Sequence, residues 1–330
     1  MTVVAQAVAA FGARIGVLSG VLGRRVAIDA DEVLDRSPFI VLAPPGRCSP
    51  NGSCRLLRAV DGWVAVNLPR ESDFELIPAW FGGDTQDAGW ARVEQEIARR
   101  GWREVVADAR LLGLPVAGVQ EMAGMGPGVS LHRLGAGGRT GRLNVVDLSS
   151  LWAGPLCGGI FSRMGAEVTK IESLSRPDPT RAMPGFHARL NGGKRDVSLD
   201  FSDPADRAVL RQRLVGADVV ITSARLRAFE QLGLAPQEIF AANPALVWVA
   251  VSGYGWTGDA ADRVAFGDDA AAAGGLVRWG EDGVPGFGGD ALADPLSGLA
   301  AAAGALSALS QGGGYLVDVA MAQVAAGVAG

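Results

Sequence analysis

The side chain best placed for chemistry is that of Asp294, which directly precedes Pro295 and a run of small and apolar residues, 296–309. The run has the composition of a helix, and proline is favoured at the first helical position because its missing N–H would be unpartnered there anyway. We therefore expect Asp294 to be the N-cap, where free backbone N–H groups and the helix dipole stabilise a carboxylate. An ionised, fixed aspartate among small residues is suited to be a carboxylate nucleophile. Capping alone is the other explanation of this pattern.

Further polar groups follow predicted strands. Trp152, Lys170 and Ser223 each come after an apolar stretch. In a parallel sheet the carboxyl ends of the strands share one edge, where ligands bind, so we expect these residues on one rim. The turn 191–195, Asn-Gly-Gly-Lys-Arg, has two cations that could meet phosphates, as could Arg225, although on the sequence alone solvated turn charges are the favoured explanation.

Other candidate groups are weaker. Asp268-Asp269 could be an acid/base pair or metal ligands, but no third ligand stands at a metal-like spacing, and we favour a hydrogen-bonded turn. His132 and His187 are isolated. The three cysteines form no C-x-x-C pair, so a zinc site is not expected, and no G-x-S-x-G motif offers a serine nucleophile.

The elements that must position these residues form two patterns. From residue 143, near-continuous apolar strands alternate with helices, which predicts an α/β fold with a doubly wound parallel sheet. Before it, Asp61-Gly62 turns a β-hairpin that is followed by short amphipathic helices, a small α+β unit. We expect an N-terminal helix (1–23) packing on the large domain, the small α+β domain (24–125), a glycine-rich linker (126–142) and the large domain (143–330).

Composition narrows the class of protein. The chain has 330 residues, 48% of them hydrophobic, and a net charge of −5, which argues against nucleic acid as the main partner. Three cysteines, an odd and low count, fit a reducing cytoplasm. Arg14 interrupts the first apolar run, which weakens a signal-peptide reading, and we expect no membrane span.

Ordered motifs give the chain a family resemblance. It resembles the family III CoA-transferases, also called the CaiB/BaiF family. The matching stretches are 145–149 with 153–155, 165–172, 191–200, 217–220, 232–234, 243–247, 252–255 and 315–320.

The resemblance implies a fold, a reaction and a site. The family's nucleophile is an aspartate four residues before a glycine, as Asp294 stands before Gly298. The reaction implied is CoA transfer from an acyl-CoA to a carboxylic acid, with CoA as substrate and no permanent cofactor. The implied CoA contacts are Trp152, Ala153, Gly154, Lys170, Glu172, Asn191, Lys194, Arg195, Ser223 and Arg225.

The order of the domains differs from the family. Residues 61–66 and 111–117 resemble its small domain, which normally follows the large domain that carries the aspartate, so the chain resembles a circularly permuted member. Family members form interlocked homodimers, and a homodimer is therefore implied.

Two departures keep alternatives open. Trp152 replaces the glutamine of some formyl-CoA-type transferases, and Gly267-Asp268-Asp269 replaces the Gly-His-Asp triplet of α-methylacyl-CoA racemases. The alternatives are a 2-methylacyl-CoA racemase or epimerase, which the missing histidine disfavours, and a CoA-binding relative without catalysis.

Overall fold

A computed structural model describes residues 2–83, 89–138, 141 and 143–330. These residues divide into two compact units. The large unit is drawn from Met1–Ile40, Val129–Ala261 and Pro295–Ala320, and the small unit from Val41–Gly128, Asp262–Asp294 and Met321–Gly330.

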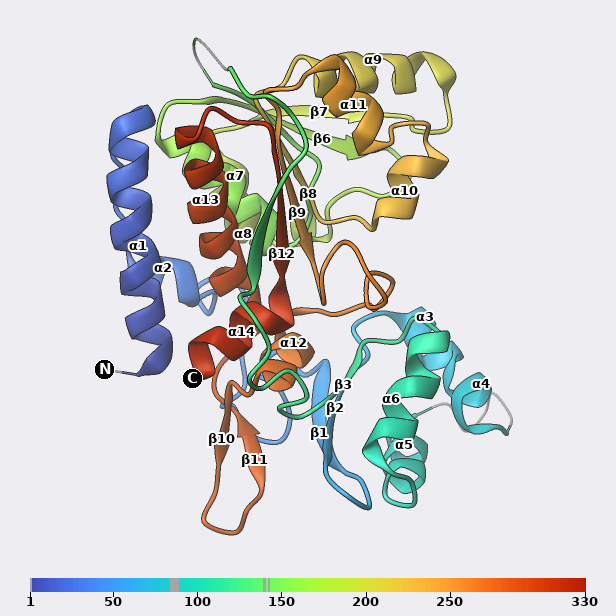
Figure 1. The fold of residues 1–330 in the computed structure, drawn as a ribbon. Coiled ribbons are helices and arrows are strands. Elements are labelled where there is room, and N and C mark those ends of the chain that lie inside the picture. Colours follow the sequence, from blue (N-terminus) through green and yellow to red (C-terminus); the bar gives the residue numbers. More distant parts are fainter. Residues whose placement is uncertain (1, 84–88, 139–140, 142) are drawn as a thin grey trace. The chain divides into compact units, whose positions relative to one another are not determined.

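In the described residues the large unit contains a seven-stranded sheet, ordered β4-β12-β9-β8-β5-β6-β7 (Figure 1). All neighbouring strands are parallel except β4, which pairs antiparallel with β12 at the edge. The central strands β8 and β9 are buried on both faces, which is why their sequences are almost wholly apolar. The strands are β4 (Val129–Arg133), β5 (Asn144–Asp147), β6 (Glu167–Ser173), β7 (Arg195–Leu199), β8 (Val219–Thr222), β9 (Val247–Ser252) and β12 (Tyr315–Ala320).

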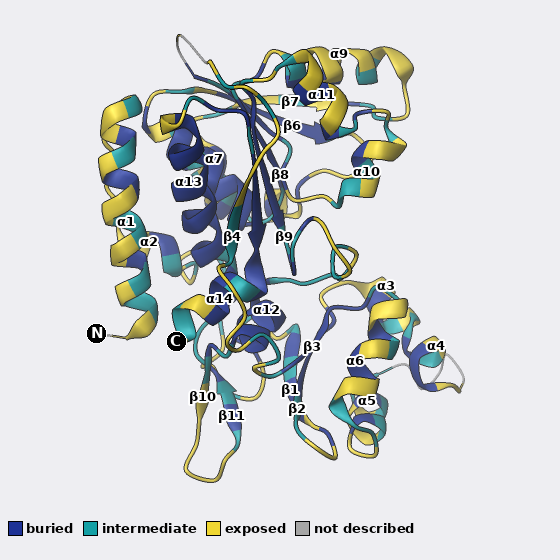
Figure 2. Ribbon diagram, in the orientation of Figure 1, coloured by how far each residue is buried: buried dark blue, intermediate teal, exposed yellow. Residues whose placement is uncertain are grey.

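Helices cover both faces of this sheet (Figure 1). One face carries α1 (Val3–Leu22), α2 (Ala30–Leu34), α7 (Ala153–Arg163), α8 (Pro184–Asn191), α13 (Ala293–Ser310) and the 3₁₀ helix η2 (Pro179–Ala182). The other carries α9 (Pro204–Val215), α10 (Leu226–Gln231) and α11 (Pro236–Ala242), whose apolar side chains form one core with Trp248 and Trp256. Figure 2 shows α13 buried along nearly its whole length, whereas much of α1 is exposed. The alanine- and glycine-rich sequence of α13 allows this close packing.

The small unit is built on an antiparallel sheet in the order β1-β2-β3. Its strands are β1 (Cys54–Arg58), β2 (Trp63–Asn67) and β3 (Val116–Gly118), and its first helices are α3 (Glu71–Glu75), α4 (Ile77–Phe81), α5 (Trp90–Ile97) and α6 (Trp102–Leu111). These helices close a core around Val64, Val66 and Trp80. The unit also holds α12 (Gly267–Gly274), the hairpin of β10 (Val277–Trp279) and β11 (Pro285–Phe287), and α14 (Met321–Ala329). Helix α12 packs against β2, β3 and α14.

The doubly wound α/β sheet predicted from the sequence is confirmed, with an antiparallel edge strand added. That strand, β4, lies within residues 126–142, which the glycine content had marked as a linker. Residues 139, 140 and 142 of the expected linker lie outside the described residues. The compact units also have other bounds than the expected domains, because 262–294 and 321–330 belong to the small unit and 24–40 to the large one. Periodicity identifies elements but not the distant partner on which each one packs.

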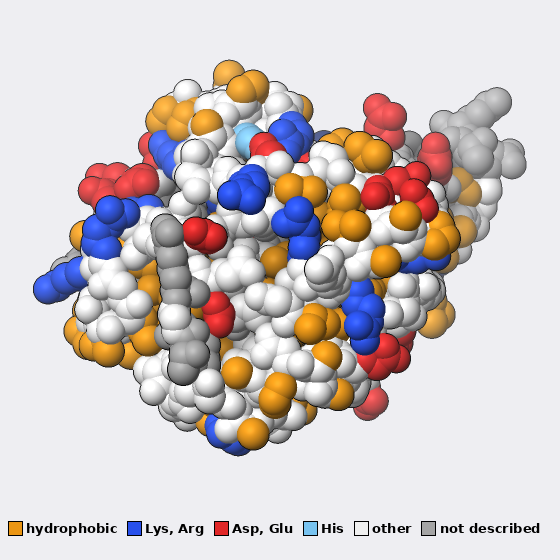
Figure 3. Space-filling view, turned by 90° about the horizontal axis from the view of Figure 1, so that it is seen from above, with side chains coloured by type: hydrophobic (Ala, Val, Ile, Leu, Met, Phe, Trp, Pro, Cys, Tyr) orange, Lys and Arg blue, Asp and Glu red, His pale blue; other side chains and the backbone are white. Residues whose placement is uncertain are grey.

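One described helix, α1, has the length and mean hydropathy of a membrane span, and 22% of its most apolar window is buried. Core helices and N-terminal signal sequences share these properties, so α1 by itself is weak evidence of a membrane span. In Figure 3 basic and acidic side chains are interspersed over the described part of the face shown.

Candidate active site

Asp294 lies in the first turn of α13 and not at its N-cap, so the expected capping position is wrong. The helix begins one residue earlier, at Ala293, because the chain turns sharply at Ala291, whose φ is +45°. The N–H of Asp294 donates to the carbonyl oxygen of Ala291 at 2.9 Å and closes this turn. A non-glycine residue in the left-handed region is strained, and such strain is concentrated at functional sites.

The carboxylate of Asp294 lies against the backbone of Gly267, at the start of α12. A Cβ atom at position 267 would overlap Oδ2 of Asp294 and lie 2.6 Å from the carbonyl oxygen of Ala291. Only glycine therefore fits here without moving the aspartate. Asp294 and the start of α12 are thus in direct contact within the small unit.

Two further carboxylates stand beside this turn. Asp268 accepts the N–H of Ala291 at 2.8 Å and the amide of Asn51 at 2.6 Å. The same amide nitrogen of Asn51 donates to Asp290 at 3.0 Å. Asp268 and Asp290 are both buried. One neutral amide thus holds two acidic side chains around the Ala291 turn.

Asp269 points instead toward β2. Its Oδ1 accepts the amide of Asn67 at 2.8 Å and the N–H of Phe266 at 3.0 Å. Burial, with a smaller contribution from neighbouring Asp268, raises the pKa of Asp269 to about 7, against the opposing effect of both hydrogen bonds.

Asn51, Asn67 and Asp290 are not among the functional residues predicted from the sequence. The two asparagines lie more than 200 positions from their partners, and nothing in their local sequence signals the contact.

The predicted CoA contacts lie in the large unit, and several converge around the loop after β5. The Lys170 side chain is fully buried, donates to the carbonyl oxygen of Ser149 at 2.6 Å, and lies 3.0 Å from Asp178 and 3.8 Å from Glu172. Asp178 in turn accepts the N–H of Leu151, another non-glycine residue with positive φ, +69°. Lys170 therefore fixes the loop that leads into Trp152.

Lys194 is a second lysine whose side chain is buried. Its Nζ donates to Asp147 at 2.7 Å, to the carbonyl oxygen of Pro155 at 2.8 Å and to Asn191 at 2.7 Å. Burial alone would raise the pKa of Asp147, but the charges of Lys194 and Lys170, together with hydrogen bonds from Lys194 and Ser149, outweigh it and hold that pKa below its ordinary value. Both lysines are thus neutralised by carboxylates within the large unit.

The remaining predicted contacts differ in access. Trp152 is buried, packs edge-on against Phe186 at 5.0 Å and has the guanidinium of Arg36 above its ring at 5.1 Å. Ala153 and Gly154 are buried at the start of α7, where a side chain at 154 would overlap Ser149. At the surface, Arg195 and Ser223 are exposed and Arg225 is half-buried, and Ser223 Oγ accepts the N–H of Ser150 at 3.0 Å.

Glu172 is held in an ion-pair cluster that resembles a metal site only in its geometry. Glu172, His187 and Asp196 have ligand atoms within 4.8 Å of one another. Arg181 already binds both carboxylates, at 2.9 Å from Glu172 and 3.4 Å from Asp196. A guanidinium in this place supplies the positive charge that a cation would bring.

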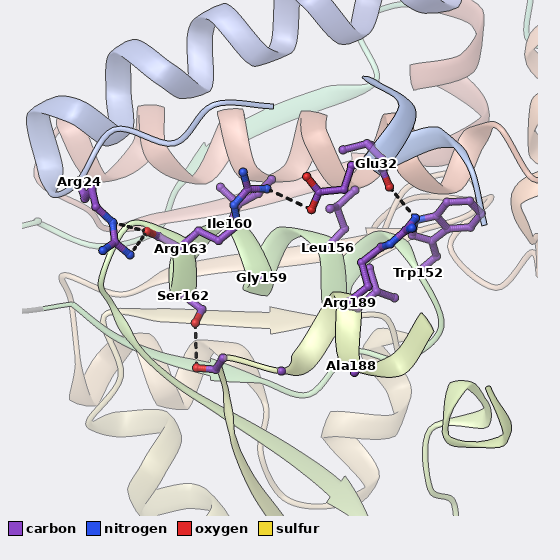
Figure 4. Close-up of a pocket in the computed structure, with 14 residues that line it drawn as sticks. Arg24, Glu32, Trp152, Leu156, Gly159, Ile160, Ser162, Arg163, Ala188 and Arg189 are labelled. Atoms are coloured by element: carbon purple, nitrogen blue, oxygen red, sulfur yellow. Dashed lines mark hydrogen bonds and ion pairs between the residues drawn. The ribbon is translucent and has the colours of Figure 1, made fainter. Parts of the chain in front are cut away.

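Figure 4 shows a cavity of about 340 Å³ in the large unit, between α7, α8 and the segment around α2. Trp152 lies at one end of it, and Arg163 and Arg189 extend along it. Arg163 donates to the carbonyl oxygen of Ala27 at 2.6 Å, and Arg189 to that of Glu32 at 2.8 Å, so both arginines tie the N-terminal segment to the sheet's helices.

The mostly parallel, doubly wound sheet places the chain in the α/β class, whose members bind ligands at the carboxyl ends of the strands. Residues 142–330 match the family described as CoA-transferase family III, and the chain belongs to that family.

Similar curated proteins include a CoA-transferase and an acyl-CoA racemase. The chain is 33% identical over 193 residues to succinyl-CoA–D-citramalate CoA-transferase of Chloroflexus aurantiacus, covering 54% of this chain and 48% of the relative. It is 34% identical over 116 residues to human alpha-methylacyl-CoA racemase, covering 35% and 28%. The chain therefore spans about half the length, or less, of these relatives.

A solved structure of a CaiB/BaiF family protein from Brucella suis matches with a TM-score of 0.53 and 31% identity. The match covers 58% of this chain and 56% of that one. The likeness thus extends over the fold as well as the motifs.

Proposed function

We propose that this protein transfers CoA from an acyl-CoA donor to a carboxylic acid, with Asp294 as the nucleophile. The observation that carries the proposal is the fixed carboxylate of Asp294, resting on Gly267 at the first turn of α13. Membership of the CoA-transferase family supports the reaction class.

The chemistry requires only a carboxylate nucleophile. Asp294 attacks the thioester carbonyl, the C–S bond breaks, and an acyl-aspartyl anhydride and CoA thiolate form. The thiolate attacks the aspartyl carbonyl, releasing the donor acid and leaving an aspartyl-CoA thioester. The acceptor carboxylate attacks this thioester, and the expelled thiolate then takes the acceptor acyl group, which restores Asp294. Dividing the exchange into such steps lowers each barrier.

Backbone groups would stabilise the oxyanions formed on the way. The proposed donors are N–H groups of the glycine-rich stretch Gly286–Gly289 and of the start of α13, which both lie close to Asp294 in the sequence. Preorganised N–H donors of this kind contribute the largest single effect in many acyl-transfer enzymes.

CoA binding is assigned to the predicted set in the large unit. Trp152, Ala153, Gly154, Glu172, Asn191, Arg195, Ser223 and Arg225 are the proposed direct contacts. Lys170 and Lys194, with their buried carboxylate partners, would act by shaping the loops. CoA is the substrate, and we propose no resident cofactor.

The proposal extends to the domain order, the oligomeric state, the location and the partners. The family match begins at residue 142, and the β1–β3 sheet precedes it, which supports a circularly permuted order. We propose an interlocked homodimer in the cytoplasm, with an acyl-CoA and a carboxylic acid as the small-molecule partners.

Racemisation or epimerisation of a 2-methylacyl-CoA is the second candidate, because Asp268 and Asp294 flank one turn and a racemase is among the relatives. Asp268 already accepts two hydrogen bonds, which disfavours it as a proton carrier. Solvent deuterium incorporated at Cα without any acceptor acid would favour racemisation.

A CoA-transfer assay with a panel of acyl-CoA donors and acids tests the proposal. Asp294→Asn should abolish transfer and leave the unfolding midpoint nearly unchanged. Asp203→Asn is the matched control, because Asp203 caps α9 at the surface and asparagine caps equally well. CoA binding without turnover in the unmodified protein would select the non-catalytic alternative, and full activity of Asp294→Asn would refute the assignment.

A further inference from the structure

The pairing of Asn67 with Asp269 leaves two buried oxygens unsatisfied. Asn67 Nδ2 donates to Asp269 Oδ1 at 2.8 Å, and both side chains are almost completely buried. Within the described residues, neither Asn67 Oδ1 nor Asp269 Oδ2 has a hydrogen-bond partner. Leaving such atoms unpaired in the interior is costly.

A single proton satisfies both atoms. An asparagine oxygen can only accept, and a carboxylate can donate only when protonated. Asp269 Oδ1 already accepts from Asn67 and from the N–H of Phe266 at 3.0 Å, so Oδ2 is the oxygen available for the proton. We infer that Asp269 is protonated and donates from Oδ2 to Oδ1 of Asn67, closing an acid–amide pair that positions the first turn of α12.

The surroundings favour the neutral acid. Asp268 beside it and the Cys54 thiol on β1 interact electrostatically with Asp269, and burial raises the pKa of that thiol. Asp294 lies against Gly267, two residues before Asp269. The ranges of β2, β3 and α14, which pack on α12, contain no ionisable side chain. Arg70, above the ring of Phe266, is paired with Asp73. The pKa of Asp269, raised to about 7, agrees with this environment.

The pair would act on the proposed reaction through position alone. It ties β2 to the turn that contains Gly267 and Asp268, against which Asp294 lies. Loss of the proton would remove one bond of the pair and place a charge beside Asp268. Asp269 is therefore a positioning residue, and this consequence, unlike the pair itself, rests on the proposed function.

Infrared difference spectroscopy on the full chain tests the pair without any activity. The spectrum of the unmodified protein minus that of Asp269→Asn should show the carbonyl stretch of a protonated carboxyl group below about pH 7, lost as the pH rises further. Absence of that band at all pH values would overturn the inference, whether or not the protein is a transferase.

Unfolding provides a second readout. In Asp269→Asn, two amides can form both hydrogen bonds. The double variant Asn67→Asp with Asp269→Asn again has one acid and one amide, with the acid now at position 67. The unmodified protein should lose several degrees in its unfolding midpoint as the pH rises toward 7, and Asp269→Asn should not. Asp269→Ala should be destabilised at every pH. Equal pH profiles for the unmodified protein and Asp269→Asn would contradict the pair.

If transfer is measurable, its pH profile links the pair to the reaction. We expect kcat/KM of the unmodified protein to fall above about pH 7 and that of Asp269→Asn to stay level. An infrared band without any transferase activity would uphold the pair and reject the proposed function.

Discussion

The carboxylate of Asp294 packs directly against the backbone of Gly267 and occupies the place that a Cβ atom at position 267 would need. Each residue of the triplet Gly267-Asp268-Asp269 therefore makes a different contact. Its glycine receives Asp294, Asp268 holds the Ala291 turn, and Asp269 joins β2.

Gly267→Ala should displace Asp294 and reduce CoA transfer at least tenfold, because small misplacements of a catalytic group cost much of its effect. The backbone oxygen of Ala291 cannot move aside cheaply, so we also expect stability to fall by about 1–3 kcal/mol. Gly327→Ala is the control, since that helical glycine in α14 has open space around it and alanine there should be neutral or stabilising. Activity near that of the unmodified protein in Gly267→Ala would contradict the proposed contact.

Gly298→Ala should separate α13 from α7. A Cβ at 298 would lie 2.6 Å from the carbonyl oxygen of Ala153 and 2.9 Å from the side chain of Leu156. We expect a loss of about 1–3 kcal/mol in urea unfolding. An unchanged midpoint would show that the helices have room to adjust.

Lys194→Met should be strongly destabilising, because it leaves Asp147 buried without its main cation. The expected loss is about 3–5 kcal/mol in the free energy of unfolding at neutral pH. Arg195→Met, at the exposed neighbouring position, should change stability by less than about 0.5 kcal/mol. Similar losses in the two variants would refute the structural role of the Lys194–Asp147 pair.

The same pair predicts acid sensitivity. The pKa of Asp147 is lower in the folded state than its ordinary value of 3.8, so its stabilisation is present above that value and is lost as the pH falls through the folded pKa. Chemical unfolding below about pH 4 should therefore show a steeper loss in the unmodified protein than in Lys194→Met. Parallel curves would exclude Asp147 as the source.

Asn51→Asp tests the amide that joins two carboxylates. The change keeps the shape of the side chain but removes the donor that Asp268 and Asp290 share, and it adds a third acid. We expect a loss of about 1–3 kcal/mol at neutral pH. The defect should shrink below about pH 4, where a protonated acid at position 51 can donate again. A defect that does not depend on pH would point to packing instead of charge.

The sequence was informative where the pattern is local. The strands β5 to β9 and β12, and a helix after Asp294, could be predicted because each depends on a few neighbouring residues. The partners of Lys170 and Lys194 could not, since Asp178 and Asp147 reach them only through the sheet topology. Strand β4 pairs with β12, far along the chain, and Asn51 and Asn67 reach α12 in the same non-local way.

The central claim is that Asp294 forms a covalent intermediate. Incubation with succinyl-CoA or acetyl-CoA and hydroxylamine, followed by peptide mass spectrometry, tests it most directly. We predict a hydroxamate on Asp294, or a CoA adduct at Asp294 when hydroxylamine is omitted, and none in Asp294→Asn. An unmodified Asp294 during measured CoA transfer would contradict the account.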